Sequence, residues 1–317
     1  MRIAFVVDPL RSLKAYKDTS IALMRAAQAA GHAVWAVRQE AIHWSAQHGV
    51  CAEALHLEML ADDDDWFVEV DRHVVALRDF AAVLMRKDPP FDAEYVTSTW
   101  LLERAEAEGA RVFNRPRALR DHSEKLSVAE FAQFAVPAVV ARAPALIQAF
   151  IELERDTIVK PLDGMGGTGV FRVRRDDPNR NVIVETLTDD GARTVMAQRY
   201  IPEIADGDKR ILIVGGEVVP YCLARIPKAG ETRGNLAVGG RGVARELTAR
   251  DREIATALAP VLAARGLFFV GLDVIGDWLT EINITSPTCI VEIAEQTGFD
   301  AAELFIVALE RECAPAA

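Results

Sequence analysis

Two acidic residues and an amide occur at short spacing near the C-terminal end of the chain. Asp273, Glu281 and Asn283 belong to the stretch DVIGDWLTEIN, which is typical of two strands joined by a turn. A three-residue turn at 276–278 would place Asp273 opposite Glu281, on the same face as Asn283. Two close carboxylates repel unless a cation lies between them, and oxygen donors suit Mg²⁺ completed by phosphate oxygens. A solvent-facing acidic strand is the alternative interpretation.

Four glycines occur within the seven residues 163–169, in the stretch KPLDGMGGTGVFRV. They satisfy G-x-G-x-x-G, but a dinucleotide-binding fingerprint requires a helix after it, and residues 170–174 alternate as a strand does. No Lys-Ser or Lys-Thr pair follows, which argues against a P-loop. The pattern therefore predicts either a glycine flap that covers ATP phosphates between two antiparallel strands, or an ordinary flexible hairpin tip.

Several basic residues occur where buried strand or helix is expected. Lys160 ends an apolar strand and Lys125 lies on a predicted helix, so both could reach phosphate as point charges. Arg210 and Arg225 belong to the two strands that flank the hairpin signal at 215–216. We expect both guanidinium groups to face one anion.

A further arginine, Arg86, follows a strand predicted at 81–85. Ligands of parallel sheets bind beyond the carboxyl ends of the strands, so Arg86 is expected to clamp a substrate carboxylate. A surface salt bridge would explain it nearly as well.

The connection at 226–241 has no strand or helix pattern, which is long for a compact domain. Its glycine-rich ends suit hinges, and Arg233 and Asn235 could contact a substrate when it closes. We interpret it as a lid, with plain disorder as the alternative.

Composition excludes several classes of protein. The 317 residues are 50% hydrophobic and 26% charged, with a formal net charge of -11, so a nucleic-acid or anionic-membrane partner is not expected. The N-terminus begins directly with a strand pattern, and we expect neither a signal peptide nor a membrane span. The four cysteines are widely spaced without C-x-x-C, which predicts reduced thiols and a cytoplasmic location.

Three units are predicted along the chain. Alternating strand and helix patterns at 3–7, 18–31, 33–37, 81–85, 93–108 and 111–114 indicate a parallel α/β domain at 1–120. A helix at 123–134, a strand at 136–141, a helix from 144 and the glycine hairpin indicate a small α+β domain at 121–192. Residues 193–317 are predicted to be mostly antiparallel, with a hairpin at 210–221.

Six stretches together resemble the family of bacterial glutathione synthetases, within the ATP-grasp superfamily. They are LMRKDPPFD (84–92), KPLDGMGGTG (160–169), DGDKR (206–210), PYCLARIP (220–227), GETRGNLAVGGRG (230–242) and FVGLDVIG followed by LTEIN and TSPTC (269–289). The resemblance implies an ATP-grasp fold: the N-terminal α/β domain, a central lid domain and a C-terminal catalytic domain. It also implies a cytoplasmic homo-oligomer, with a tetramer favoured over a dimer.

The resemblance further implies an ATP- and Mg²⁺-dependent ligase, with Mn²⁺ as an alternative metal, that joins γ-glutamylcysteine to glycine. Two other functions stay open: a ligase for another acid and amine, and a non-catalytic nucleotide-binding module. Nucleotide-binding roles carry over to Lys125, Lys160, Gly164, Gly166, Gly167, Thr168, Gly169, Gln198, Tyr200, Ile201, Asp208 and Arg210. Catalytic roles carry over to Arg210, Arg225 and Arg233, and metal binding to Asp273, Glu281 and Asn283. Substrate contacts carry over to Asp18, Arg86, Arg225, Arg233, Asn235, Asn283, Ser286 and Thr288.

Overall fold

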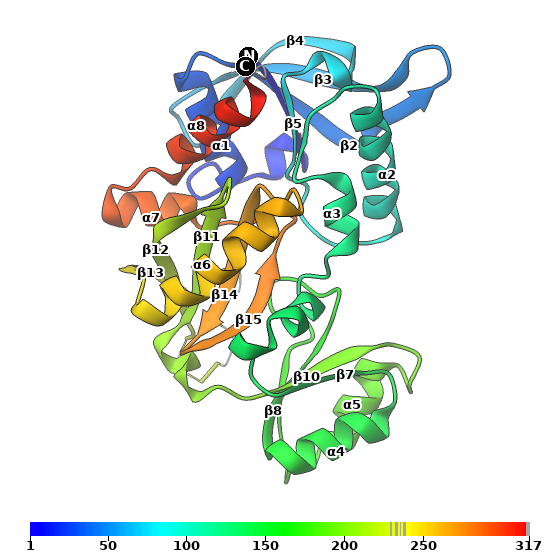
Figure 1. Ribbon diagram of the computed structural model, residues 1–317, viewed down its shortest axis with the longest axis vertical. Helices are drawn as coiled ribbons and strands as arrows, with labels where there is room; N and C mark the ends of the chain where they lie inside the picture. The colour runs from blue at the N-terminus through cyan, green and yellow to red at the C-terminus, as the bar shows by residue number, and fades with distance from the viewer. Residues whose placement is uncertain (229, 232–233, 235, 237–238, 315–317) are drawn as a thin grey trace.

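The computed structural model describes residues 1–228, 230–231, 234, 236 and 239–314. Three sheets follow one another along the long axis of the molecule, with the N-terminal sheet at the top of Figure 1 and the central sheet at the bottom. Their strand orders are β4-β3-β2-β1-β5-β6, then β7-β10-β8-β9, then β13-β12-β11-β14-β15. The fold is the mixed α/β and α+β arrangement that the sequence predicts.

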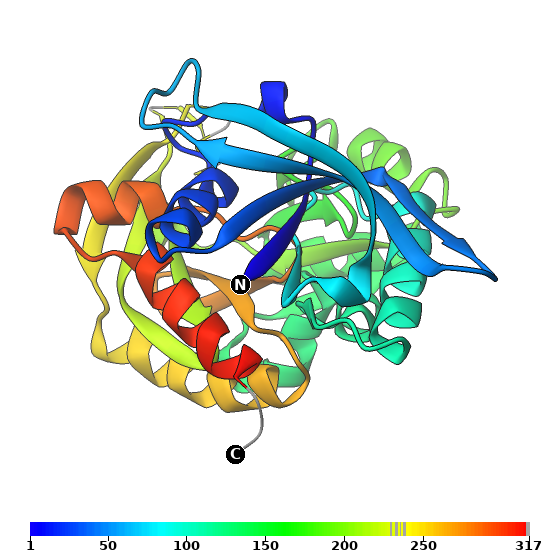
Figure 2. The same ribbon diagram turned by 90° about the horizontal axis from the view of Figure 1, so that it is seen from above.

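The N-terminal sheet is only partly parallel. Its strands are β1 (Arg2–Val7), β2 (Ala33–Ser45), β3 (Gly49–Met59), β4 (Phe67–Ala76), β5 (Ala82–Met85) and β6 (Val112–Phe113). Strands β1, β2, β5 and β6 pair in parallel, as in the predicted parallel α/β domain, whereas β3 and β4 add an antiparallel edge that the sequence pattern does not predict. The antiparallel β2–β3 hairpin extends away from the body of the molecule (Figure 2).

Helices cover both faces of this sheet. They are α1 (Thr19–Ala29), α2 (Ala93–Ala107) and α3 (Pro116–Asp121), with the short 3₁₀ helices η1 (Leu10–Ser12) and η2 (Leu77–Asp79) between strands. The carboxylate of Asp18 accepts a hydrogen bond from the backbone N–H of Ile21 at 3.0 Å and so caps the first turn of α1. Asp92 caps α2 in the same way.

The central unit begins with the 3₁₀ helix η3 (Leu126–Phe134), followed by β7 (Ala138–Ala141), α4 (Pro144–Glu154), β8 (Asp156–Pro161), β9 (Phe171–Arg174), α5 (Arg180–Thr188) and β10 (Val195–Arg199). In place of the helix predicted at 123–134 the structure has two short 3₁₀ pieces within 126–134, interrupted at Phe131, whose torsions (φ -119, ψ 44) are not helical. Strand β10 pairs with β7 and β8, so the central sheet extends past the predicted boundary at 192.

The C-terminal unit is an antiparallel sheet flanked by helices. It contains η4 (Pro202–Asp206), β11 (Asp208–Val214), β12 (Glu217–Ile226), β13 (Arg241–Glu246), α6 (Ala249–Ala264), β14 (Phe269–Ile275), β15 (Trp278–Asn283), α7 (Ile290–Thr297) and α8 (Ala301–Cys313). Gly215 and Gly216 both have positive φ, 56° and 83°, which a primed two-residue turn between β11 and β12 requires. The predicted hairpin is confirmed.

The first and third units share a hydrophobic cluster, whereas the sheet of the second unit has a cluster of its own. One hydrophobic cluster contains residues of β1 and α1 together with residues of β11 and α8, such as Phe5, Met24, Leu212 and Phe305. The central sheet packs α4 and α5 around a separate small cluster. The central unit is therefore a body with its own core that adjoins the other two.

Within the described part of the chain, no helix is long and apolar enough to cross a membrane.

Candidate active site

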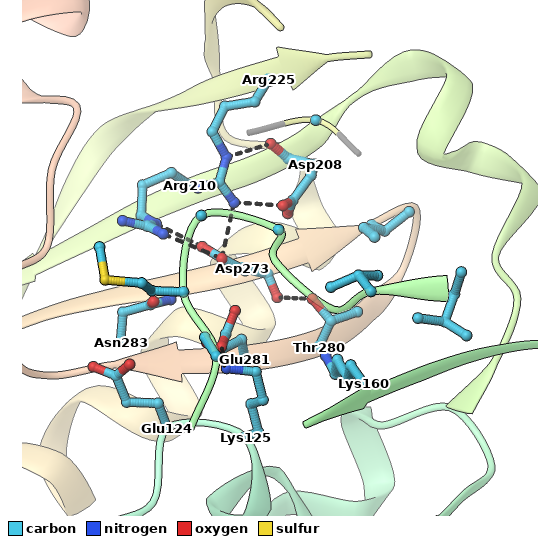
Figure 3. A pocket seen from close by; sticks show the side chains of 18 of the residues that line it. Glu124, Lys125, Lys160, Asp208, Arg210, Arg225, Asp273, Thr280, Glu281 and Asn283 are labelled. Carbon is cyan, nitrogen blue, oxygen red and sulfur yellow. Dashed lines mark hydrogen bonds and ion pairs between the residues drawn. The ribbon is translucent and has the colours of Figure 1, made fainter. Parts of the chain in front are cut away.

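A cavity of about 350 Å³ is lined by residues from all three units. The glycine-rich loop and β8 of the central unit border it, as do β11, β12, β14 and β15 of the C-terminal sheet. The linker before η3 and the turn after β5 complete its wall. Figure 3 shows the charged side chains that converge in it.

A buried carboxylate and two guanidinium groups form the centre of the cavity. Asp273 on β14 lies directly opposite Arg210 on β11, and Arg210 donates to its two oxygens at 2.5 and 3.2 Å (Figure 3). Arg225, one strand further on β12, makes an ion pair with Asp273 at 2.8 Å. Arg210 and Arg225 do face one anion, as predicted, but in this structure that anion is the carboxylate of Asp273.

A second carboxylate, Asp208, shares Arg225 and lies opposite it in the register of β11 and β12. Burial would raise the pKa of Asp273, but the two arginines hold that pKa well below its ordinary value. Burial raises the pKa of Asp208 to about 6 despite its ion pair with Arg225, and the neighbouring charge of Asp273 acts in the same direction. One buried oxygen of the Asp208 carboxylate has no hydrogen-bond partner. The two guanidinium groups therefore stabilise the ionised form of Asp273 more than that of Asp208, because Asp273 receives most of their bonds.

The register of β14 and β15 brings Glu281 opposite Asp273, as predicted. The turn, however, takes two residues rather than three, and an irregularity at Thr280 restores the register. The hydroxyl of Thr280 donates to the carbonyl of Asp273 at 3.1 Å, which stabilises this bulge. The predicted pairing is therefore correct although the predicted turn is wrong.

Lys125 connects this acidic pair to the glycine-rich loop. Its ammonium group is 2.8 Å from a carboxylate oxygen of Glu281 and donates to the carbonyl of Gly164 at 2.6 Å. Burial alone would lower the pKa of Lys125, but Glu281 raises it, so the side chain stays charged. Lys160, at the end of β8, lies in the same cavity, and burial lowers its pKa.

The donor set of Asp273, Glu281 and Asn283 can be tested against a hard cation. The amide nitrogen of Asn283 donates to Gly271 at 3.2 Å, while its amide oxygen is a ligand that Mg²⁺ accepts. Among the residues that the structure describes, no three His, Cys, Asp or Glu side chains form a metal-binding group, and here only two carboxylates are joined by an amide. Two opposed carboxylates and an amide oxygen in a cavity fit Mg²⁺ that also has phosphate ligands.

The part of the cavity beneath the glycine-rich loop is lined mostly by apolar side chains. Ile158, Val170, Ile201, Ile204 and Ile275 line it, together with Gln198 and Tyr200. One side-chain nitrogen of Gln198 is buried without a partner, so a ligand that accepts a hydrogen bond would satisfy it. An apolar lining with one unpartnered polar group suits the base of a nucleotide, and we call this region the apolar slot.

Glycine is required in the loop for two reasons. Gly166, Gly167 and Gly169 have φ values of 62°, 82° and 71°, which L side chains rarely adopt. At Gly164 a Cβ would lie 2.9 Å from the Pro161 ring, so the loop could not approach β8 so closely with any other residue.

Most of the predicted site residues are brought together. The lining contains Lys125, Lys160, Gly164, Gly166, Gly167, Thr168, Gln198, Tyr200, Ile201, Asp208, Arg210, Arg225, Asp273, Glu281, Asn283, Ser286 and Thr288. Gly169 is not in the lining, and Asp18 is engaged as the cap of α1. Arg233 and Asn235 lie outside the described residues.

Arg86 does not line the cavity as a clamp would. Its guanidinium is buried, donates to the carbonyl of Pro287 at 2.8 Å and to the hydroxyl of Ser20 at 3.2 Å, and leaves one nitrogen without a partner. It thus links the main chain at Pro287 to α1, which carries Ser20. The acidic neighbour Asp88 lines the cavity instead and accepts a hydrogen bond from Ser286.

Sequence reasoning missed Glu124. One of its carboxylate oxygens accepts from the backbone of Ile284 and Thr285 at 2.8 and 3.1 Å, and it also accepts from the Thr285 hydroxyl at 3.0 Å. These bonds fix the chain directly after Asn283. Glu124 precedes Lys125 in a segment without strand periodicity, so no pattern identifies it.

Comparisons with known proteins identify one family over nearly the whole chain. The model of the "Prokaryotic glutathione synthetase, N-terminal domain" matches residues 1–120, and the model of the "Prokaryotic glutathione synthetase, ATP-grasp domain" matches residues 124–298. The glutathione synthetase of Ralstonia nicotianae is 57% identical over 98% of this chain and 96% of its own. That of Nitrosomonas europaea is 54% identical over 99% of both chains.

Solved structures agree on the fold. A D-cycloserine synthetase has a TM-score of 0.69 at 18% identity and covers 99% of this chain and 100% of its own. A RimK-domain ATP-grasp protein from Sphaerobacter thermophilus has a TM-score of 0.61 at 20% identity, covering 98% of this chain and 100% of its own. At this identity the likeness concerns the ATP-grasp fold alone.

Proposed function

The chain belongs to the prokaryotic glutathione synthetase family, and on that basis we propose that its cavity uses ATP to join γ-glutamylcysteine to glycine. The chain is an ATP-dependent ligase that makes glutathione. The observation that carries the site assignment is the convergence of Arg210, Arg225 and Lys125 on Asp273 and Glu281 beneath the glycine-rich loop.

The nucleotide is assigned to the part of the cavity beneath that loop. Its base occupies the apolar slot beside Tyr200 and Gln198, where the unpartnered nitrogen of Gln198 awaits an acceptor. Its phosphates extend towards Lys125 and Lys160, whose ammonium groups act as point charges. Backbone N–H groups of the glycine-rich loop can approach the phosphates because no Cβ intervenes.

Asp273, Glu281 and Asn283 would hold the divalent cation, and we propose Mg²⁺, with Mn²⁺ as the alternative, because both ions accept six oxygen ligands and phosphate oxygens can complete that shell. When bound, that ion neutralises phosphate charge. The two arginines contact one of these ligands, Asp273. Arg210 and Arg225 present guanidinium nitrogens to the cavity from adjacent strands and can bind the oxygens of a transferring phosphoryl group.

Two chemical steps follow from the poor reactivity of a free carboxylate. First, the cysteinyl carboxylate of the dipeptide forms a bond to the γ-phosphorus of ATP while the bond to the β,γ-bridging oxygen breaks, releasing ADP. The glycine amine then forms a bond to the acyl carbon, phosphate leaves with the bonding electrons, and the amine loses a proton to solvent. Positioning and charge neutralisation supply most of the catalysis.

No side-chain nucleophile is needed for these steps. Cys289 lines the cavity, but burial raises the pKa of its thiol and keeps it protonated. It therefore serves to pack the wall of the cavity.

The acyl phosphate must be protected from water, and we assign that task to the segment 226–241. Gly234 and Leu236 of this segment line the cavity. A Cβ on Gly234 would lie 2.3 Å from the carbonyl of Arg225, so Gly234 itself packs tightly against β12. Exclusion of water at this point suits a reactive intermediate.

The proposed assembly is a homo-oligomer, a tetramer rather than a dimer, and the proposed compartment is the cytoplasm. Four free cysteines, three of them buried, agree with a reducing compartment. Sedimentation of the purified protein measures the assembly directly.

The test of the reaction is ADP release with γ-glutamylcysteine and glycine, each alone and both together. Rapid turnover that requires both substrates supports the assignment. Turnover with another acid or amine in place of either would favour the alternative ligase, and nucleotide binding without turnover would favour a non-catalytic module.

A further inference from the structure

Arg172 on β9 joins three segments of the central unit. Its guanidinium donates to both oxygens of Asp156 on β8, at 2.9 and 2.6 Å, in a two-pronged ion pair. The same guanidinium lies over the ring of Tyr200, with its central carbon 3.6 Å from the ring centroid. A guanidinium this close above a ring makes a cation–π contact, and that contact restrains the position of the ring.

Tyr200 is held to Asp156 by its backbone as well. Its N–H donates to the carbonyl of Asp156 at 2.9 Å, directly after β10 ends. Asp156 thus holds the main chain of Tyr200 directly and the ring of Tyr200 through Arg172. Because Tyr200 lines the apolar slot, the position of its ring decides how wide that slot is.

Arg172 also lies close in sequence to the glycine-rich loop, since β9 begins at Phe171, two residues after Gly169. A side chain on this strand can therefore link the ordering of the loop to the shape of the slot. Its neighbour Arg174 provides a comparison on the same strand. Arg174 is 3.8 Å from the carboxylate of Asp156 and 62% exposed, whereas Arg172 is 27% exposed.

We propose that Arg172 is a positioning residue for the nucleotide: by fixing the ring of Tyr200, it sets the affinity of the slot for the base of a purine nucleoside triphosphate. The inference rests on the proposed nucleotide site and adds to it a residue that touches neither phosphate nor substrate. Its effect is expected on base recognition and not on the chemical step.

The experiment measures binding of ADP and ATP by calorimetry, and the KM for ATP and kcat at saturating dipeptide and glycine. Arg172→Met should raise the Kd for ADP and the KM for ATP about tenfold while kcat stays within about twofold, since a partly desolvated stacking contact is lost. Arg172→Lys should give most of this loss, because an ammonium cannot reproduce the planar fork. Arg174→Met is the matched control and should bind ADP as the wild type does.

Inorganic tripolyphosphate separates base recognition from a general loss of structure. It carries the phosphates without the base, so its inhibition constant should be the same for Arg172→Met and the wild type. If Arg172 instead supports the whole central unit, the variant will bind tripolyphosphate and ATP more weakly by the same factor, and the inference is wrong. Thermal unfolding of each variant identifies any that fail to fold.

A double-mutant cycle gives the second measurement. In a Tyr200→Leu background, Arg172→Met should have little further effect on ADP binding, because the ring that it positions is absent. Equal losses in both backgrounds would overturn the inference. Wild-type protein that binds no nucleotide would instead overturn the proposed site, so the two failures are distinguishable.

Discussion

Asp273 of β14 lies directly opposite Arg210 of β11, and both of its carboxylate oxygens accept hydrogen bonds from that guanidinium, at 2.5 and 3.2 Å. The pair is buried, and Arg225 adds a third contact to the same carboxylate at 2.8 Å. A charge cluster of this kind is costly to desolvate and is retained where fixed charges serve function. The pair therefore defines the point at which the phosphoryl group is expected to react.

Arg210→Lys should lower kcat for glutathione formation by at least about a hundredfold, because a point charge cannot reproduce the fork that holds both oxygens of Asp273 and faces the cavity. Steady-state kinetics at saturating substrates measure it. The matched control is Arg245→Lys, an exposed arginine of β13 in the same sheet. If only the KM values rise and kcat is unchanged, Arg210 contributes binding that is equal in the ground and transition states.

Glu281→Gln should abolish ligation while leaving the fold intact, because it removes a charge but little volume from the donor set beside Asp273. Lys125 loses its partner at 2.8 Å, so ADP binding should change as well, though less than kcat. The measurements are kcat and thermal unfolding, with Glu246→Gln on the exposed face of β13 as the control. A variant that retains more than about a tenth of the wild-type rate, a loss below about 1.4 kcal/mol, contradicts the metal assignment.

Buried His122 should make stability depend on pH. Burial lowers the pKa of His122 to about 4, and neither ring nitrogen has a hydrogen-bond partner in the described structure. Its ordinary pKa is 6.5, so in the window from about pH 6.5 down to about pH 4 the unfolded chain binds a proton that the folded chain does not. The stability that neutral His122 contributes is therefore complete above pH 6.5 and is lost as the pH falls.

His122→Leu should remove this dependence. The unfolding free energy of the wild type, relative to that of the variant, should fall by about 2 kcal/mol when the pH is lowered from about 7.5 to about 5. Urea denaturation at several pH values measures it. His48→Asn, at an exposed histidine of the β2–β3 turn, should leave the pH profile unchanged. A constant difference between wild type and His122→Leu would mean that His122 titrates alike in both states.

The sequence predicts the charged residues of the site better than their contacts. The pairing of Asp273 with Glu281 is a consequence of strand periodicity, but the bulge at Thr280 that secures it depends on a hydroxyl bond back to Asp273. Periodicity also places Arg210 and Arg225 on adjacent strands, yet whether they bind a substrate or a carboxylate of the protein depends on which strand lies next to them. That neighbour, β14, is far away in sequence.

Long-range packing also explains two features that local patterns do not predict, the antiparallel edge of the N-terminal sheet and the buried contacts of Arg86. Strands β3 and β4 extend the sheet antiparallel from a hairpin whose turn, 46–48, has no glycine pair to announce it. Arg86 follows its strand as expected, but helix α1 and the segment at 287 close over it. Both results depend on which elements pack together, which local patterns do not specify.

The last prediction concerns the segment 226–241 through its described residue Gly234. A methyl group there would lie 2.3 Å from the carbonyl of Arg225 and 3.3 Å from the Cβ of Asp208, and these backbone and buried neighbours cannot move aside cheaply. Gly234→Ala should therefore lift the segment from the cavity and admit water to the acyl phosphate. The expected result is more phosphate released than glutathione formed.

The measurement is the ratio of phosphate to glutathione in one reaction, with dipeptide and glycine saturating. Wild type should give one to one, and Gly234→Ala an excess of phosphate, because hydrolysis competes with attack by the glycine amine. Gly230→Asn is the control, since Asn tolerates the positive φ of 85° at Gly230 and a Cβ there meets nothing within 4 Å. A one-to-one ratio in Gly234→Ala would reduce the segment to a passive connection, because the reacting centre would then be shielded by the glycine-rich loop and the strands alone.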